Sequence, residues 1–89
     1  MHSKEIINVL RDKIDLLDEQ MLYLLVQRFS ISRKIGKIKA SCGINVGDPN
    51  REQEIIDHLA EKLEGKLERN DIAAIFGPIY QISKKLQKK

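Results

Sequence analysis

The chain has 89 residues, of which 42% are hydrophobic, 33% are charged and only 4% are aromatic. A chain of this length forms one small domain, so residues 1–89 are treated as a single domain with an aliphatic core. The scarcity of aromatic residues excludes an aromatic surface for stacking bases or sugars. The net charge of +3 fits a small anionic ligand or a nucleic acid, without requiring either.

The first forty residues predict one long helix, from about Lys4 to Ala40. Apolar residues recur there at alternating spacings of three and four, which is typical of a coiled-coil seam. The seam positions are Ile7, Leu10, Ile14, Leu17, Met21, Leu24, Arg28, Ile31, Ile35 and Ile38. Arg28 is the charged exception. It sets the register of the seam, reaches water at its edge, or binds a negative group there, because a buried guanidinium needs an anion.

The length of this helix predicts a homodimer. About 37 residues give a helix of roughly 55 Å, whereas a compact chain of this size has a radius of gyration of about 12 Å. Half of the apolar stripe would face water if the chain were alone. We therefore expect a second copy to cover it, most simply in a two-fold dimer.

A loop with two glycines follows, at Ser41 to Gly47. Asp48 and Pro49 then predict a helix start, with Asp48 as the N-cap and Pro49 in the first helical position. This second helix is expected to continue to about Glu64, since Gly65 is a natural stop.

The third helix is expected to begin with Asn70 or Asp71 as its cap. Its apolar stripe continues to Leu86, and Pro78 should kink it, because proline cannot bond back to Ala74. No alternating strand pattern occurs in the sequence. The fold class predicted is therefore all-α, with one long and two shorter helices per chain in an intertwined homodimer.

Several cations stand out as candidate ligands for an anion. Lys39 lies eleven residues after Arg28, which places both on one helix face. Arg11 is about 25 Å from Arg28 along the same helix, so it reaches Arg28 only from an antiparallel partner. Arg51 lies in the first turn of the second helix, where the helix dipole disfavours a cation.

Four further candidates are Asp48, Glu52, Ser83 and Gln87. Asp48 and Glu52 also suit a helix N-terminus for purely structural reasons. Ser83 and Gln87 are four residues apart on one face of the third helix, where they also fit ordinary helix surface. Together with the cations, these groups can bind a small polyanion and stabilise charge.

Other chemistries are missing from the pattern. His58 has no neighbours at a metal-ligand spacing, and there is no glycine-rich phosphate loop. The lone cysteine, Cys42, has no evident histidine partner and cannot form an internal disulfide. We expect no metal, no cofactor, no signal peptide and no membrane span, and therefore a soluble cytoplasmic protein.

The ordered segments of the chain resemble the all-helical chorismate mutases. The resemblance rests on Leu10–Asp18, Leu24–Arg28, Ile35–Lys39 and Asp48–Glu52, and it extends over essentially the whole chain. It implies a three-helix chain that intertwines into a dimer. It also implies the cofactor-free Claisen rearrangement of chorismate to prephenate, in phenylalanine and tyrosine biosynthesis.

The resemblance further implies roles for the charged candidates. Arg28 and the partner's Arg11 match the arginines that bind the two carboxylates of the substrate. Lys39 matches the cation that contacts the ether oxygen and a carboxylate, and Gln87 matches the second donor to that oxygen.

The remaining candidates match residues around the polar edge of the substrate. Arg51 and Asp48 match pocket residues there. Glu52 matches the carboxylate that accepts a hydrogen bond from the ring hydroxyl, and Ser83 matches a hydroxyl near a carboxylate.

Three alternatives remain open from the sequence. An isochorismate-pyruvate lyase would use the same fold on a similar dicarboxylate. A non-catalytic helical dimerisation or nucleic-acid-binding module would use the basic residues Arg33, Lys34, Lys37, Lys39, Lys84, Lys85, Lys88 and Lys89. A catalytically inactive homologue is the third. Acidic residues scattered along the same helices argue against nucleic acid as the partner.

Overall fold

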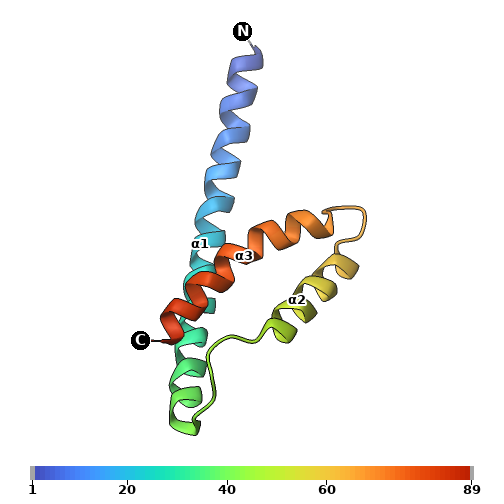
Figure 1. The fold of residues 1–89 in the computed structure, drawn as a ribbon. Helices are drawn as coiled ribbons and strands as arrows, with labels where there is room; N and C mark the ends of the chain where they lie inside the picture. Colours follow the sequence, from blue (N-terminus) through green and yellow to red (C-terminus); the bar gives the residue numbers. More distant parts are fainter. Residues whose placement is uncertain (1, 89) are drawn as a thin grey trace. The chain divides into compact units, whose positions relative to one another are not determined.

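The computed structural model describes residues 2–88, and this range contains three α-helices (Figure 1). They are α1 (His2–Cys42), α2 (Pro49–Lys62) and α3 (Arg69–Gln87). The described residues include no strand, so the predicted all-α class is confirmed. Within that range, none of the helices combines the length and apolar character needed to cross a bilayer.

The chain divides into two compact units, which meet after Ser30. In the first unit, residues 2–30 form one uninterrupted helical segment, the N-terminal part of α1. The second unit, residues 31–89, contains the end of α1 together with α2 and α3.

Apolar side chains of the first unit are largely exposed to solvent. Twelve large ones have exposed fractions between 46% and 68%. They are Ile6, Ile7, Val9, Leu10, Ile14, Leu16, Leu17, Met21, Leu22, Tyr23, Leu24 and Val26. Helices in proteins owe most of their stability to the packing of an apolar face. Within its own unit, the apolar face of this segment is not packed against another element.

Helix α1 extends two residues beyond its predicted range at each end. Gly43 ends it with a φ of 68°, a left-handed conformation that glycine adopts without strain. The N–H of Ile44 donates to the carbonyl of Lys39 at 2.8 Å, which satisfies one of the last helical carbonyls. The stop signal is therefore Gly43, where the sequence suggested that the loop begins at Ser41.

Helix α2 begins as predicted. The Oδ1 atom of Asp48 accepts a hydrogen bond from the N–H of Arg51 at 3.1 Å, and Pro49 occupies the first turn. The helix ends at Lys62, and Gly65 has a φ of 81° in the following turn.

Helix α3 begins earlier than predicted, and neither Asn70 nor Asp71 caps it. The cap position is Glu68, whose backbone is extended and whose side chain makes no capping bond. Arg69 forms an ion pair with Asp57 of α2, which holds the first residue of α3 beside α2. This start therefore carries a tertiary contact in place of a side-chain cap. The helix continues through Pro78 to Gln87.

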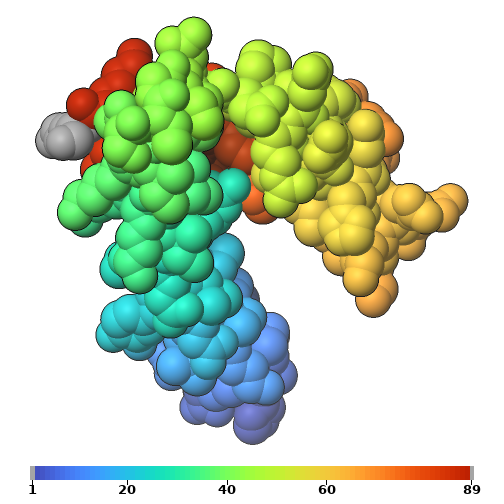
Figure 2. Space-filling model, turned by 90° about the horizontal axis from the view of Figure 1, so that it is seen from below, coloured from blue at the N-terminus to red at the C-terminus, as the bar shows by residue number. Residues whose placement is uncertain are grey.

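The core of the second unit is small and lies along α3. Ile72 is 1% exposed and Tyr80 is 6% exposed. The rings of Phe76 and Tyr80 pack at a centroid distance of 5.6 Å and a tilt of 47°. In Figure 2 the end of α1, in green, and α2, in yellow-green to yellow, lie in front of much of α3, in orange to red, on the face shown.

Candidate functional site

Tyr80, Ser83, Lys84 and Gln87 share one face of the C-terminal half of α3, and Glu52 of α2 contacts two of them. We call these five residues the polar cluster. The Nζ atom of Lys84 lies 3.2 Å from a carboxylate oxygen of Glu52. The hydroxyl of Tyr80 donates to the backbone carbonyl of Glu52 at 3.3 Å. The first turn of α2 is thus fixed to α3 by an ion pair and a hydrogen bond.

Ser83 and the amide oxygen of Gln87 are the other buried polar groups of this cluster. Ser83 is 6% exposed. The Oε1 atom of Gln87 is buried and has no hydrogen-bond partner within the described residues. A buried polar atom without a partner costs about 1–3 kcal/mol, so such an atom is more typical of a binding site than of a packed core.

Gly36 brings the end of α3 directly against α1. A Cβ atom at Gly36 would lie 2.7 Å from the Cα atom of Gln87 and 2.7 Å from its carbonyl oxygen. Figure 1 shows the red end of α3 beside the teal-to-green part of α1, above the last turns of that helix. Lys39 follows Gly36 by three residues, so the two are neighbours on the helix surface, and Lys39 is half-buried. The structure therefore brings Lys39 and Gln87 to the same part of the second unit.

Asp48 and Arg51 are exposed on this chain, and each interacts with a residue three positions away in the sequence. Asp48 caps α2, as described above. A guanidinium nitrogen of Arg51 lies 3.6 Å from a carboxylate oxygen of Glu54, and both side chains are about two-thirds exposed. Glu54 thus offsets the unfavourable position of Arg51 in the first turn of α2.

Arg11 and Arg28 belong to the first unit. Arg11 is exposed and Arg28 is half-buried. Both lie on one continuous helix, seventeen residues apart, which separates them by about 25 Å along the axis.

Sequence reasoning missed two members of the polar cluster. It named Lys84 only among the basic residues of the nucleic-acid-binding alternative and gave Tyr80 no role. The signal was present, because Tyr80 and Lys84 are four residues apart and interleave with Ser83 and Gln87 on one face of α3.

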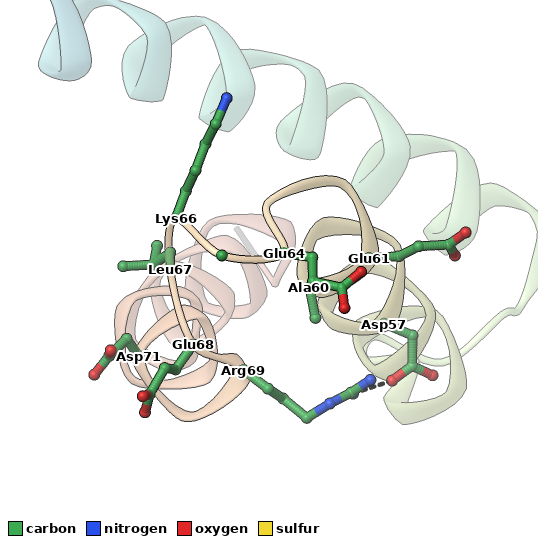
Figure 3. Close-up of a pocket in the computed structure, with 10 residues that line it drawn as sticks. Asp57, Ala60, Glu61, Glu64, Lys66, Leu67, Glu68, Arg69 and Asp71 are labelled. Atoms are coloured by element: carbon green, nitrogen blue, oxygen red, sulfur yellow. Dashed lines mark hydrogen bonds and ion pairs between the residues drawn. The ribbon is translucent and has the colours of Figure 1, made fainter.

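A separate hollow of about 920 Å³ lies where α2 turns into α3 (Figure 3). Its charged lining residues are Asp57, Glu61, Glu64, Lys66, Glu68, Arg69 and Asp71, with acidic groups in excess. Arg69 points at Asp57 in Figure 3. The hydrogen bond from Arg69, and to a smaller extent that from Gln53, lowers the pKa of Asp57 from its usual value of 3.8. The net negative charge of the lining disfavours binding of a dicarboxylate. This hollow therefore does not suit the small anion that we expect the candidate cations to bind.

The described residues contain no group of histidine, cysteine and carboxylate side chains suited to holding a metal ion. The polar cluster and Lys39 instead supply cations, an amide, hydroxyls and one carboxylate. Such an arrangement can bind an anion and donate hydrogen bonds to a developing negative charge.

Comparison with known proteins gives a consistent result. The family model described as chorismate mutase type II matches residues 10–88. The chorismate mutase of Methanocaldococcus jannaschii is 34% identical over 80 residues, which cover 89% of this chain and 81% of that protein. The bifunctional chorismate mutase/prephenate dehydratase of Aquifex aeolicus is 38% identical over 50 residues, 56% of this chain and 14% of that protein. The family match includes every candidate residue named above.

Proposed function

This chain belongs to the chorismate mutase type II family, and from that membership we propose that it rearranges chorismate to prephenate in aromatic amino acid biosynthesis. The observation that carries the proposal is the match across residues 10–88, which spans α2, α3 and most of α1.

The reaction suits the side chains that the fold supplies. In the Claisen rearrangement one C–O bond breaks as one C–C bond forms, and no atom, proton or electron leaves the molecule. The protein has to hold the substrate in its compact reactive form and to stabilise the negative charge that builds on the ether oxygen. Arginines that grip the two carboxylates perform the first task, and donors to the ether oxygen perform the second.

Lys39 and Gln87 are the proposed donors to the ether oxygen. The close contact of Gly36 with Gln87 supports this assignment, because it places the end of α3 one helical turn from Lys39. One such donor is typically worth roughly 3 kcal/mol in the transition state, or about a hundredfold in rate. Gln87 is a neutral amide and donates without having to be protonated.

Arg28 and the partner's Arg11 are the proposed carboxylate ligands. This pairing requires a homodimer in which the partner runs antiparallel along α1. The twelve exposed apolar side chains of the first unit support the dimer. Two copies expose this set twice, and burying most of it would contribute on the order of 20 kcal/mol, which exceeds the roughly 4–15 kcal/mol that association costs.

The remaining candidates bind the polar edge of the substrate in this proposal. Lys84 contacts one carboxylate oxygen of Glu52, which leaves the other oxygen to accept a hydrogen bond from the ring hydroxyl. Ser83 donates to a substrate carboxylate, and Asp48 and Arg51 line the entrance. The same proposal places the enzyme in the cytoplasm, because the exposed thiol of Cys42 suits a reducing compartment.

The test is chorismate consumption by the purified protein, followed by chromatography, with Arg28→Ala and Lys39→Ala compared with the unaltered chain. We expect prephenate as the product and a loss of roughly a hundredfold in kcat/KM for each variant. Full activity in a folded variant would remove that residue from the site.

A further inference from the structure

We propose that Gly36 is a positioning residue whose missing side chain sets where the amide of Gln87 lies relative to Lys39. The proposal rests on the function proposed above, in which Gln87 donates to the ether oxygen. Gly36 itself touches no substrate atom in this account and acts only through Gln87.

The geometry around Gly36 leaves no room for a side chain. A Cβ atom there would lie 2.7 Å from both the Cα atom and the carbonyl oxygen of Gln87, and 2.9 Å from its Cβ atom. The first two atoms are backbone, so rotation of the Gln87 side chain cannot relieve the contact. Any larger residue at position 36 must therefore displace α3 itself.

The displacement can be estimated from ordinary contact distances. Carbon atoms that are not bonded approach to about 3.5–4.0 Å, so alanine at position 36 would move the end of α3 by roughly 1 Å. A shift of this size in a catalytic group costs about a hundredfold in rate. Gln87 lies at the point of contact, so its amide takes the full shift.

Helix α1 gives no local reason for a glycine at this position. Gly36 lies inside the helix, where alanine has the higher helix propensity. One turn earlier on α1, Ser32 is also small and only 7% exposed. The requirement for a small residue therefore comes from the approach of α3 and not from α1.

Gly77 provides a matched control. It also lies inside a helix, α3, and a Cβ atom there would meet nothing within 4 Å apart from its chain neighbours and the backbone of its own helix. A Gly77→Ala variant makes the same chemical change without a contact to another helix, so it should keep the activity of the unaltered protein once circular dichroism shows that alanine before Pro78 leaves α3 folded.

The experiment compares steady-state kinetics on chorismate for the unaltered protein, Gly36→Ala, Gln87→Ala, the double variant and Gly77→Ala. Circular dichroism and sedimentation establish that each one folds. We expect kcat of Gly36→Ala to fall about a hundredfold with KM within about threefold. The double variant should then lie within about threefold of Gln87→Ala alone, because no amide remains to be misplaced.

Four results would overturn the proposal: unchanged kcat in Gly36→Ala, losses that multiply in the double variant, a Gly36→Ala chain that does not fold, or full activity in Gln87→Ala. A nuclear Overhauser contact between the α-protons of Gly36 and Gln87 tests the geometry in the unaltered protein, and its absence would also overturn the proposal. Failure of the proposed function itself is distinguishable, since the unaltered protein would then not consume chorismate.

Discussion

Subunit complementation tests the proposed contribution of Arg11 to the site of the other chain. Within one chain, Arg11 and Arg28 lie seventeen residues apart on α1, or about 25 Å, so one small ligand cannot touch both. A charge-assisted hydrogen bond contributes about 2–3 kcal/mol. Arg11→Ala and Arg28→Ala should therefore each lose roughly 30- to 150-fold in kcat/KM.

Mixing the two variants should restore activity. In a mixed dimer, one of the two sites has Arg28 from one chain and Arg11 from the other, so it is intact. Random pairing at equal amounts makes half of the dimers mixed, so about a quarter of all sites are restored. The mixture should thus reach about a quarter of the unaltered activity, whereas each parent retains about 3% or less.

The assay is chorismate consumption after the two variants are unfolded together and refolded, or produced together in one cell. The unaltered protein taken through the same treatment is the control. A mixture that is no more active than the average of its parents, in a preparation shown by mass spectrometry to contain mixed dimers, would refute the contribution of Arg11 across the interface.

Three further predictions follow from the chemistry of single groups and from the exposed apolar face of α1. Gln87→Glu should lower kcat about a hundredfold or more at neutral pH, since a carboxylate only accepts hydrogen bonds. The variant should regain activity at acid pH, where the carboxylate is protonated. A pH profile identical to that of the unaltered protein would contradict this. Sedimentation should give about twice the 10.3 kDa mass of one chain, and a stable, folded monomer would overturn the dimer. The lowered pKa of Asp57 means that its ion pair with Arg69 stabilises the fold above pH 3.8 and is lost as the pH falls through the lowered value. Arg69→Gln should therefore lower Tm at neutral pH but not in strong acid, and a difference that is independent of pH would count against it.

Local signals in the sequence predicted most of the helices correctly. The alternating spacing of apolar residues identified α1, and the pair Asp48 and Pro49 located the start of α2. These signals act over a few residues, so they can be read without knowledge of the fold. The predicted start of α3 was wrong. The capping preference of Asn70 and Asp71 is local and does not include the ion pair between Asp57 and Arg69, which are twelve residues apart.

The candidate site was predictable in its residue types but not in its contacts. Ser83 and Gln87 were found from their spacing on one face, and the structure buries Ser83 and packs Gln87 against α1. The role of Gly36 in that packing could not be read from the sequence, because it depends on how closely two helices approach. The partner of Glu52 was missed for the same reason, since Lys84 lies 32 residues away in the chain.

Chorismate mutase activity is tested most directly by offering the purified protein chorismate and isochorismate side by side and identifying the products by mass spectrometry. We predict that chorismate is consumed and prephenate appears without any added cofactor. Consumption of isochorismate to salicylate and pyruvate, with chorismate left intact, would contradict it.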